Sequence, residues 1–133
     1  MPSFTVPRYS DAPLAFEGEL IGSVSGEHTR PDKANNRWHE IDLYHTQSGK
    51  YVVAIRFRCS TRHDDPYDEA EVCQTPAAVV RFLNEFDPVE KVRGWPLEKH
   101  VNEDARLRHW LMVGFEQLAS QLISNRAEFA ERV

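Results

Sequence analysis

The chain has 133 residues, of which 41% are hydrophobic and 28% are charged. This balance is typical of a globular protein and excludes a disordered or fibrous chain. The formal net charge is −5, and the basic residues are spread along the chain rather than gathered in runs. The sequence therefore disfavours direct binding to nucleic acid, and its length predicts a single domain over residues 1–133.

No stretch approaches the roughly 20 apolar residues of a membrane span. The N-terminus also lacks a basic region followed by an apolar run. We therefore expect a cytoplasmic protein without a membrane partner. Cys59 and Cys73 are too few for a secreted disulfide scaffold, so we expect both to be small buried residues in neighbouring strands.

The first part of the chain predicts an extended arm followed by a strand. Residues 1–13 contain three prolines, which favours an extended arm or an edge segment. Residues 14–24 alternate with period two and predict a strand. Gly18 and Gly22 share a face of this strand and indicate a β-bulge or a close approach to the backbone. Apolar residues are expected on that same face: Leu14, Phe16, Leu20 and Val24.

A polar loop over residues 25–37 precedes a predicted β-hairpin. Residues 38–46 form its first strand, with Ile41 and Leu43 facing one way. Residues 50–59 form its second strand and have the clearest alternation in the chain. The other face of the first strand carries Trp38, Glu40, Asp42 and Tyr44. We expect its two acidic residues to meet the basic residues of the facing strand, Arg56 and Arg58.

A shorter fourth strand is expected over residues 70–74, entered through an acidic loop. Thr75 and Pro76 then predict a helix start, because a threonine hydroxyl caps free amides and proline suits the first helical position. The helix should span residues 75–87 with one apolar face. That face consists of Val79, Phe82, Leu83 and Phe86.

A long helical segment is expected over residues 102–131, capped by Asn102. Unbroken from residue 103, it would measure roughly 43 Å, which exceeds the diameter of so small a domain. It should therefore bend at Gly114 into a helix pair, or pack partly on a partner. Its apolar stripe is wide, so we expect a second buried side, by default in a symmetric homodimer.

Together these elements predict an α+β domain. Its antiparallel sheet of three to four strands forms a meander over residues 14–74. The short helix and the long C-terminal helical segment follow and pack on one face of the sheet.

The sequence contains no familiar catalytic or cofactor motif. It lacks a Gly-x-Gly-x-x-Gly or Walker loop, a His-Glu-x-x-His pair and paired Cys-x-x-Cys motifs. We therefore assign no catalytic residue, no cofactor and no metal ligand. One alternative remains open, a metal-dependent hydrolase that uses residues of the 28–65 region: His28, His39, His45 and His63 with Asp64 or Asp65.

Acidic and aromatic residues are the candidate partner-binding residues. Two aromatic residues on the more polar strand face are candidate interface anchors, because Trp and Tyr are enriched among such anchors. The acidic residues either form a solvated loop or imitate a phosphate backbone in a positively charged groove of another protein. The full set is Trp38, Tyr44, Asp64, Asp65, Asp68, Glu69 and Glu71.

Three stretches resemble small proteins encoded on bacterial plasmids, integrative elements and phages. They are residues 16–22, the hairpin over residues 37–53, and residues 72–76. The resemblance implies an architecture and a mobile-element context but no reaction. Our leading hypothesis is a non-enzymatic protein-interaction module, an accessory or counter-defence protein of which an inhibitor of a CRISPR effector is one instance. A DNA-binding plasmid or phage regulator is the second alternative, after the hydrolase.

Overall fold

The computed structural model describes residues 1–9, 11–27, 37–59, 67–89, 101–124 and 126–130, without the side chains of residues 59 and 101–107. The described elements are five strands, two α-helices and a short 3₁₀-helix. In chain order they are β1 (Ser3–Val6), β2 (Leu14–Ser25), β3 (Arg37–Thr46), β4 (Tyr51–Cys59), β5 (Tyr67–Cys73), α1 (Pro76–Glu85), α2 (Val101–Ile123) and the 3₁₀-helix (Ala127–Phe129). None of the described helices is long and apolar enough to cross a membrane.

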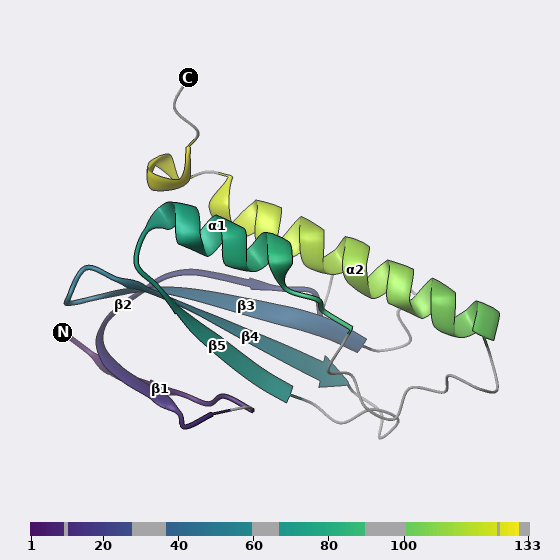
Figure 1. Ribbon diagram of the computed structural model, residues 1–133, viewed down its shortest axis with the longest axis horizontal. Helices are drawn as coiled ribbons and strands as arrows, with labels where there is room; N and C mark the ends of the chain where they lie inside the picture. Colours follow the sequence, from purple (N-terminus) through teal and green to yellow (C-terminus); the bar gives the residue numbers. More distant parts are fainter. Residues whose placement is uncertain (10, 28–36, 60–66, 90–100, 125, 131–133) are drawn as a thin grey trace.

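The strands form one antiparallel meander in the order β1-β2-β3-β4-β5 (Figure 1). This confirms the α+β class, but the sheet has five strands rather than the expected three to four. The additional strand is β1, which lies in the expected N-terminal arm. Strand β2 accommodates it because residues 14–17 pair with β1, whereas residues 18–25 pair with β3.

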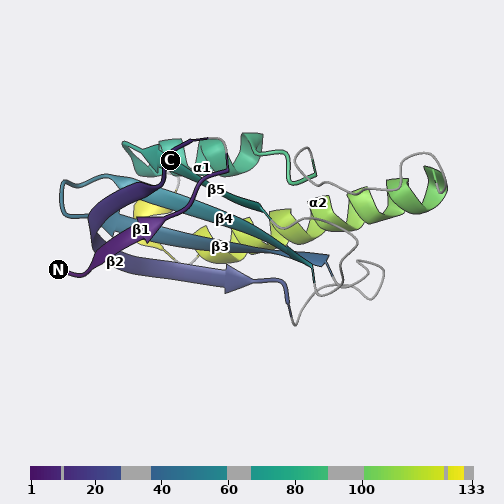
Figure 2. The same ribbon diagram turned by 90° about the horizontal axis from the view of Figure 1, so that it is seen from below.

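The sheet curls where β2 changes partners, at Gly18. Figure 2 shows β1 crossing the sheet on the side away from α2. A Cβ atom at Gly18 would overlap the carbonyl oxygen of His45 and lie 2.9 Å from the Cα atom of Thr46. Only glycine therefore lets the backbones approach this closely at the corner.

A β-bulge at Ile21, between Leu20 and Gly22, changes which side chains of β2 face the helices. The extra residue reverses the alternation. Leu20 lies opposite Tyr44 and is 49% exposed, whereas Val24 packs into the core beneath the helices. The bulge itself was expected, but the assignment of all four apolar residues to one face was wrong.

Helices α1 and α2 cover one face of the sheet, which we call the helix face (Figure 1). Helix α2 lies across β2 and β3, and α1 lies over β4 and β5. Helix α1 starts as predicted: the amide of Ala78 donates to Oγ1 of Thr75 over 3.1 Å, and Pro76 takes the first helical position. The buried core under the helices includes Ile41, Leu43, Val53, Ile55, Val79, Leu83, Phe115, Leu118 and Leu122.

The C-terminal helical segment is one helix, which continues through Gly114 and ends at Ile123. It begins at Val101, so Asn102 lies inside the helix instead of capping it. Part of the expected second apolar side is covered within the chain, because Ala119 is buried and Ile123 packs against the core. Met112 is 46% exposed on the same helix. The homodimer through this segment stays a prediction.

The two cysteines lie in neighbouring strands, β4 and β5, as expected. Cys73 is a free, buried thiol whose pKa is raised to about 11, chiefly by burial. It is therefore protonated at neutral pH and behaves as a small apolar residue. The side chain of Cys59 lies outside the described residues.

The close approach at Gly18 predicts a difference between two glycine substitutions. Gly18→Ala should lower the free energy of unfolding by ~1–3 kcal/mol, because a methyl group there overlaps backbone atoms that cannot move independently. Gly22→Ala should cost less than ~1 kcal/mol, because its Cβ would approach within 3 Å only the terminal Cδ1 atom of the Leu122 side chain and no backbone atom. Urea unfolding of both variants measures the difference, and equal costs would contradict a tight corner at Gly18.

Candidate functional site

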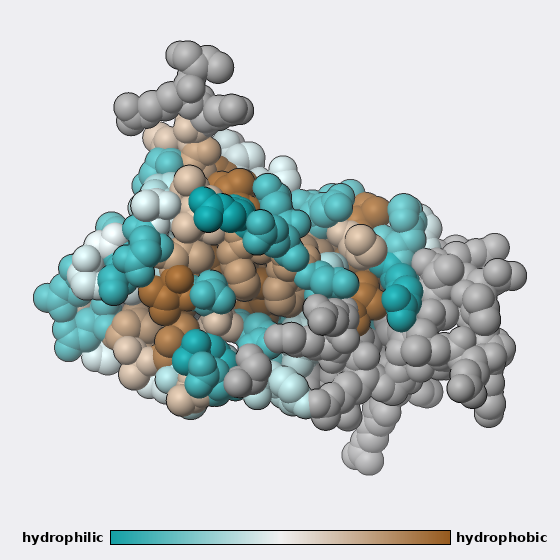
Figure 3. All heavy atoms as spheres, viewed as in Figure 1, coloured by the Kyte–Doolittle hydropathy of each residue, from teal (hydrophilic) through white to brown (hydrophobic). Residues whose placement is uncertain are grey.

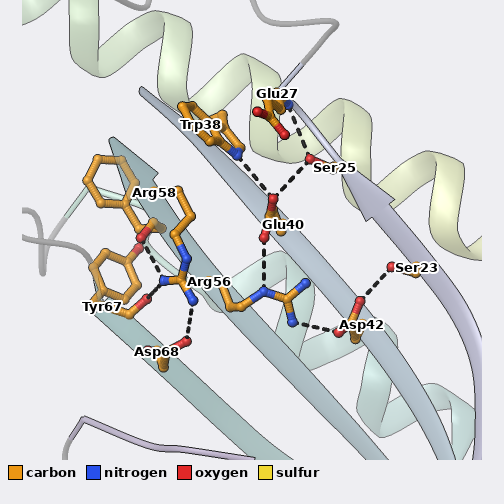
Figure 4. A network of polar contacts seen from close by, with 11 residues as sticks. Ser23, Ser25, Glu27, Trp38, Glu40, Asp42, Arg56, Arg58, Tyr67 and Asp68 are labelled. Carbon is orange, nitrogen blue, oxygen red and sulfur yellow. Dashed lines mark hydrogen bonds and ion pairs between the residues drawn. The ribbon is translucent and has the colours of Figure 1, made fainter. Parts of the chain in front are cut away.

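The face of the sheet opposite the helix face, which we call the second face, is divided into an apolar half and a polar half. In the apolar half, β1 and the start of β2 cover a buried cluster. Its buried members are Val6, Tyr44, Val52, Ala54 and Ala70, with Phe4, Leu14, Phe16 and Val72 packed around them. The polar half carries hydrogen-bonded and charged side chains, which we call the polar surface: Ser23, Ser25, Trp38, Glu40, Asp42, Arg56, Arg58 and Asp68 (Figure 4).

Strand register brings the opposite charges of the polar surface together. Arg56 lies opposite Glu40 on β3 and opposite Asp68 on β5. Its Nε donates to Oε1 of Glu40 over 2.9 Å, and its Nη1 donates to Oδ2 of Asp42 over 2.5 Å. The expected pairing of Glu40 and Asp42 with Arg56 is therefore confirmed.

Arg58 departs from the expected pairing. It lies two residues beyond Arg56 on β4, opposite Trp38, so neither acidic residue of β3 faces it. Its Nη2 instead donates to Oδ1 of Asp68 over 3.0 Å, and its Nη1 donates to the carbonyl of Tyr67 over 3.3 Å. Strand β5 thus supplies the acidic partner that β3 was expected to supply.

Glu40 joins three elements of the polar surface. Its carboxylate accepts hydrogen bonds from Arg56, from Nε1 of Trp38 over 3.1 Å and from Oγ of Ser25 over 3.2 Å. Partial burial opposes ionisation, but the hydrogen bonds from Arg56 and Trp38 outweigh it and hold the pKa of Glu40 below its usual value. Hydrogen bonding to Asp42 correspondingly raises the pKa of Arg56. The Glu40 carboxylate and the Arg56 guanidinium are therefore both charged at neutral pH.

The charged groups of the polar surface hold one another in place, and all except the buried Asp42 remain partly accessible. The side chains of Arg56, Arg58 and Asp68 are 28%, 33% and 30% exposed. Fixed side chains lose less conformational entropy when a partner binds, and a fixed charge pattern selects a complementary one. This arrangement suits recognition of a charged protein surface.

The expected partner-binding residues are only partly brought together. Trp38 and Asp68 belong to the polar surface, but Tyr44 is 7% exposed, because β1 covers it and Phe4 and Phe16 contact its ring. The placement of Tyr44 with Trp38 on an exposed surface was therefore wrong. Its ring centroid lies 4.8 Å from that of Phe4.

The acidic residues of β5 do not form one surface. Asp68 points to the second face, whereas Glu69 is 6% exposed and shares the helix face with Glu71, which is exposed. Alternation along a strand makes this split unavoidable. Asp64 and Asp65 lie outside the described residues. A single acidic surface that includes Glu69 is therefore excluded by its burial.

The two basic residues Arg56 and Arg58 and the hydroxyl groups of Ser23 and Ser25 were not among the expected site residues. Ser23 donates from Oγ to Oδ1 of Asp42 over 2.6 Å. The charge alternation in the hairpin indicated that Arg56 would be paired. Nothing in the sequence indicated that β2 would contribute, because the bulge at Ile21 decides which of its residues reach this face.

The two histidines of β3 lie in different environments. His39 is buried. Its Nε2 carries the proton of the neutral ring and donates it to the carbonyl oxygen of Pro88 over 3.0 Å. The same nitrogen lies 3.1 Å from the hydroxyl oxygen of Tyr67. Burial lowers its pKa to about 4. His45 is exposed and stacks on Tyr51 with ring centroids 4.8 Å apart.

Among the described residues, no three His, Cys, Asp or Glu side chains come together as metal ligands do. The other candidate ligands, His28, His63, Asp64 and Asp65, lie outside this part of the chain. The metal-dependent hydrolase stays an untested alternative. Comparisons with protein-family models, curated proteins and solved structures found no match. A functional proposal therefore rests on the geometry of the chain itself.

Burial of His39 predicts a specific pH dependence of stability. Its ordinary pKa is 6.5 and its folded pKa is about 4. As pH falls between these values, the unfolded chain gains a proton that the folded chain excludes, so the free energy of unfolding should fall by up to ~3 kcal/mol. The contribution of the neutral His39 to the free energy of unfolding is therefore fully present above pH 6.5 and is lost as the pH falls toward 4.

The matched variant is His39→Gln, whose neutral amide can still donate to the Pro88 carbonyl. Its free energy of unfolding should fall by ~3 kcal/mol less than that of the wild type over the same pH range. Urea unfolding at a series of pH values measures both slopes. Identical slopes would show that His39 titrates normally in the folded state.

Proposed function

We propose that the chain is a non-enzymatic protein-interaction module that binds its partner through the polar surface. The observation that carries this proposal is the ion pair between Arg58 and Asp68, which is held at 3.0 Å, is about one third exposed and lies near Trp38. A tryptophan beside organised charges is a typical interface composition.

The rigidity of the support favours the same proposal. The polar surface lies on four neighbouring strands, β2 to β5, whose opposite face is packed against two helices. A recognition surface on a packed sheet keeps its geometry better than one on a loop. The partner would meet the partly exposed side chains of Arg56, Arg58, Glu40 and Asp68, with alternating sign across the strands, while the buried Asp42 holds Arg56 in place.

We further propose that this module acts in the cytoplasm as an accessory or counter-defence protein of a mobile element. The resemblance of three stretches to proteins of plasmids, integrative elements and phages supports this context. An inhibitor of a CRISPR effector is one concrete instance, in which acidic residues meet a basic nucleic-acid channel. In that case Asp68, with Asp64 and Asp65, would carry the acidic contact, since Glu69 is buried.

A charge swap tests the role of the polar surface. The double variant Arg58→Asp with Asp68→Arg keeps an ion pair at this position but reverses its direction, so the fold should keep its stability. If the surface binds a partner, the swap should weaken capture at least ~tenfold, because complementary charges become like charges. The measurement is quantitative co-purification from a host lysate with immobilised protein at low and moderate salt.

The matched control is Gln117→Lys, a change of an exposed residue on α2, on the other side of the molecule. It should retain the partner at the wild-type level. Circular dichroism and urea unfolding would confirm that both variants are folded. Equal capture by the wild type and the charge-swapped protein would contradict binding through the polar surface.

A further inference from the structure

Strand β5 has a free edge whose outward backbone groups can be identified. Its only strand neighbour among the described residues is β4. The amide of Tyr9 donates to the carbonyl of Asp68 over 2.7 Å, so the backbone of Asp68 points away from β4. Backbone direction alternates in an antiparallel pair, so Ala70 and Val72 point outward as well. Ala70 is 7% exposed beneath β1, whereas Val72 is partly exposed. Within the described part of the chain, no hydrogen bond reaches the outward groups of these two residues.

An apolar pocket lies against the same edge. Its volume is about 450 Å³, which lies within the range of binding pockets. The side chains of Leu14, Phe16, Val52 and Val72 form its apolar lining, and the β3–β4 turn lies beside it. Figure 3 shows apolar residues at the surface in this part of the molecule, below α1.

Val72 belongs to both features. Its outward amide and carbonyl lie on the free edge, and its side chain lines the pocket. The bond between Tyr9 and Asp68 closes the other end of β5, so the free edge is confined to the end that carries the pocket. A free strand edge with an adjoining side-chain pocket is the arrangement by which sheets bind extended peptides.

We infer that this edge and pocket bind an extended segment of a partner protein, which adds a strand to β5 and inserts an apolar side chain beside Val72. The inference rests on the proposed interaction function and names the form of its ligand. Backbone hydrogen bonds to Val72, which is partly exposed, supply sequence-independent affinity, whereas Ala70 is 7% exposed and stays covered by β1. The pocket supplies selectivity for a large apolar side chain.

The charges of β5 select among extended segments. Glu71 is exposed and faces the side opposite to the pocket, so a basic residue of the ligand fits there. A second copy of β5 fits poorly: antiparallel pairing centred on Ala70 would place Glu69 of one copy opposite Glu71 of the other. Glu17 and Lys50 also line the pocket, but their charges are opposite, so together they favour neither an acidic nor a basic ligand. The ligand class is therefore a segment in which apolar and basic residues alternate.

The direct test uses the purified full chain and a fluorescein-labelled peptide, Lys-Val-Lys-Phe-Lys-Val. Fluorescence anisotropy should show saturable binding, and the amide signal of Val72 should shift in NMR spectra. A peptide of the same composition in blocks, Lys-Lys-Lys-Val-Phe-Val, should bind at least ~fivefold more weakly. When its backbone pairs with β5, its apolar and basic side chains do not alternate between the pocket side and the Glu71 side. No saturable binding of the alternating peptide at millimolar concentration, or shifts confined to the helices, would overturn the inference.

Two substitutions localise the binding. Val72→Pro removes an outward N–H that β4 does not use, so the sheet should remain intact while peptide affinity falls at least ~fivefold. Glu71→Lys should weaken binding and reduce its salt dependence, whereas Glu116→Lys on α2 should leave it unchanged. Unchanged affinity in Val72→Pro, with the fold verified by circular dichroism, would exclude strand addition.

Two further outcomes separate this inference from the proposed function. The Arg58→Asp and Asp68→Arg swap should leave peptide affinity unchanged, so loss of peptide binding in that variant would place the peptide on the polar surface instead. If light scattering shows a dimer that Val72→Pro abolishes, a second copy occupies the edge and the inference is wrong. Failure of the peptide to bind would not alter the co-purification result.

Discussion

Strand β4 is apolar on both of its faces at one end, and the rest of the fold depends on covering both. Val53 and Ile55 face the helices, Val52 and Ala54 face the other way, and all four are at most 5% exposed. Each Å² of apolar surface removed from water contributes about 25 cal/mol. The helices cover one face, and the only described elements available for the other are β1 and the start of β2. The corner at Gly18 allows this second cover.

The length of β1 determines how the second face is divided. Its four residues span ~13 Å, whereas the ten residues of β3 span ~33 Å. One short strand can therefore cover only part of the second face. The covered part is apolar, the remainder carries the paired charges around Arg56, and the pocket lies where the cover ends. Both proposed binding regions are consequences of this incomplete cover.

The polar surface and the apolar cluster make different contributions to stability. Partly exposed ion pairs typically contribute ~0–1 kcal/mol each, whereas a buried Val or Leu side chain contributes roughly 1.5–3 kcal/mol. The core under the helices and the cluster under β1 therefore hold the fold. The ion pairs of the polar surface can therefore act in recognition at little cost to stability. Reversing one pair changes the charge pattern of the surface but should change the free energy of unfolding only slightly.

Local sequence patterns predicted most of the sheet but not its curl. The alternation in β3 and β4 and the cap at Thr75 are local signals, and the structure confirms them. Strand β1 has only four residues in a proline-rich arm, and the residues it covers lie far along the chain, so no local pattern could predict its position. The bulge at Ile21 reverses one half of β2, which hid the contribution of Ser23 and Ser25 to the polar surface.

The cover provided by β1 is most directly tested by nuclear Overhauser effects between methyl and ring protons in the wild-type protein. Val6 and Ala70 lie in one buried cluster, and the ring centroids of Phe4 and Tyr44 are 4.8 Å apart. We expect cross-peaks between the methyl groups of Val6 and Ala70 and between the two rings. A folded sheet that shows the β3–β4 cross-peaks but neither of these would mean that β1 leaves the second face open.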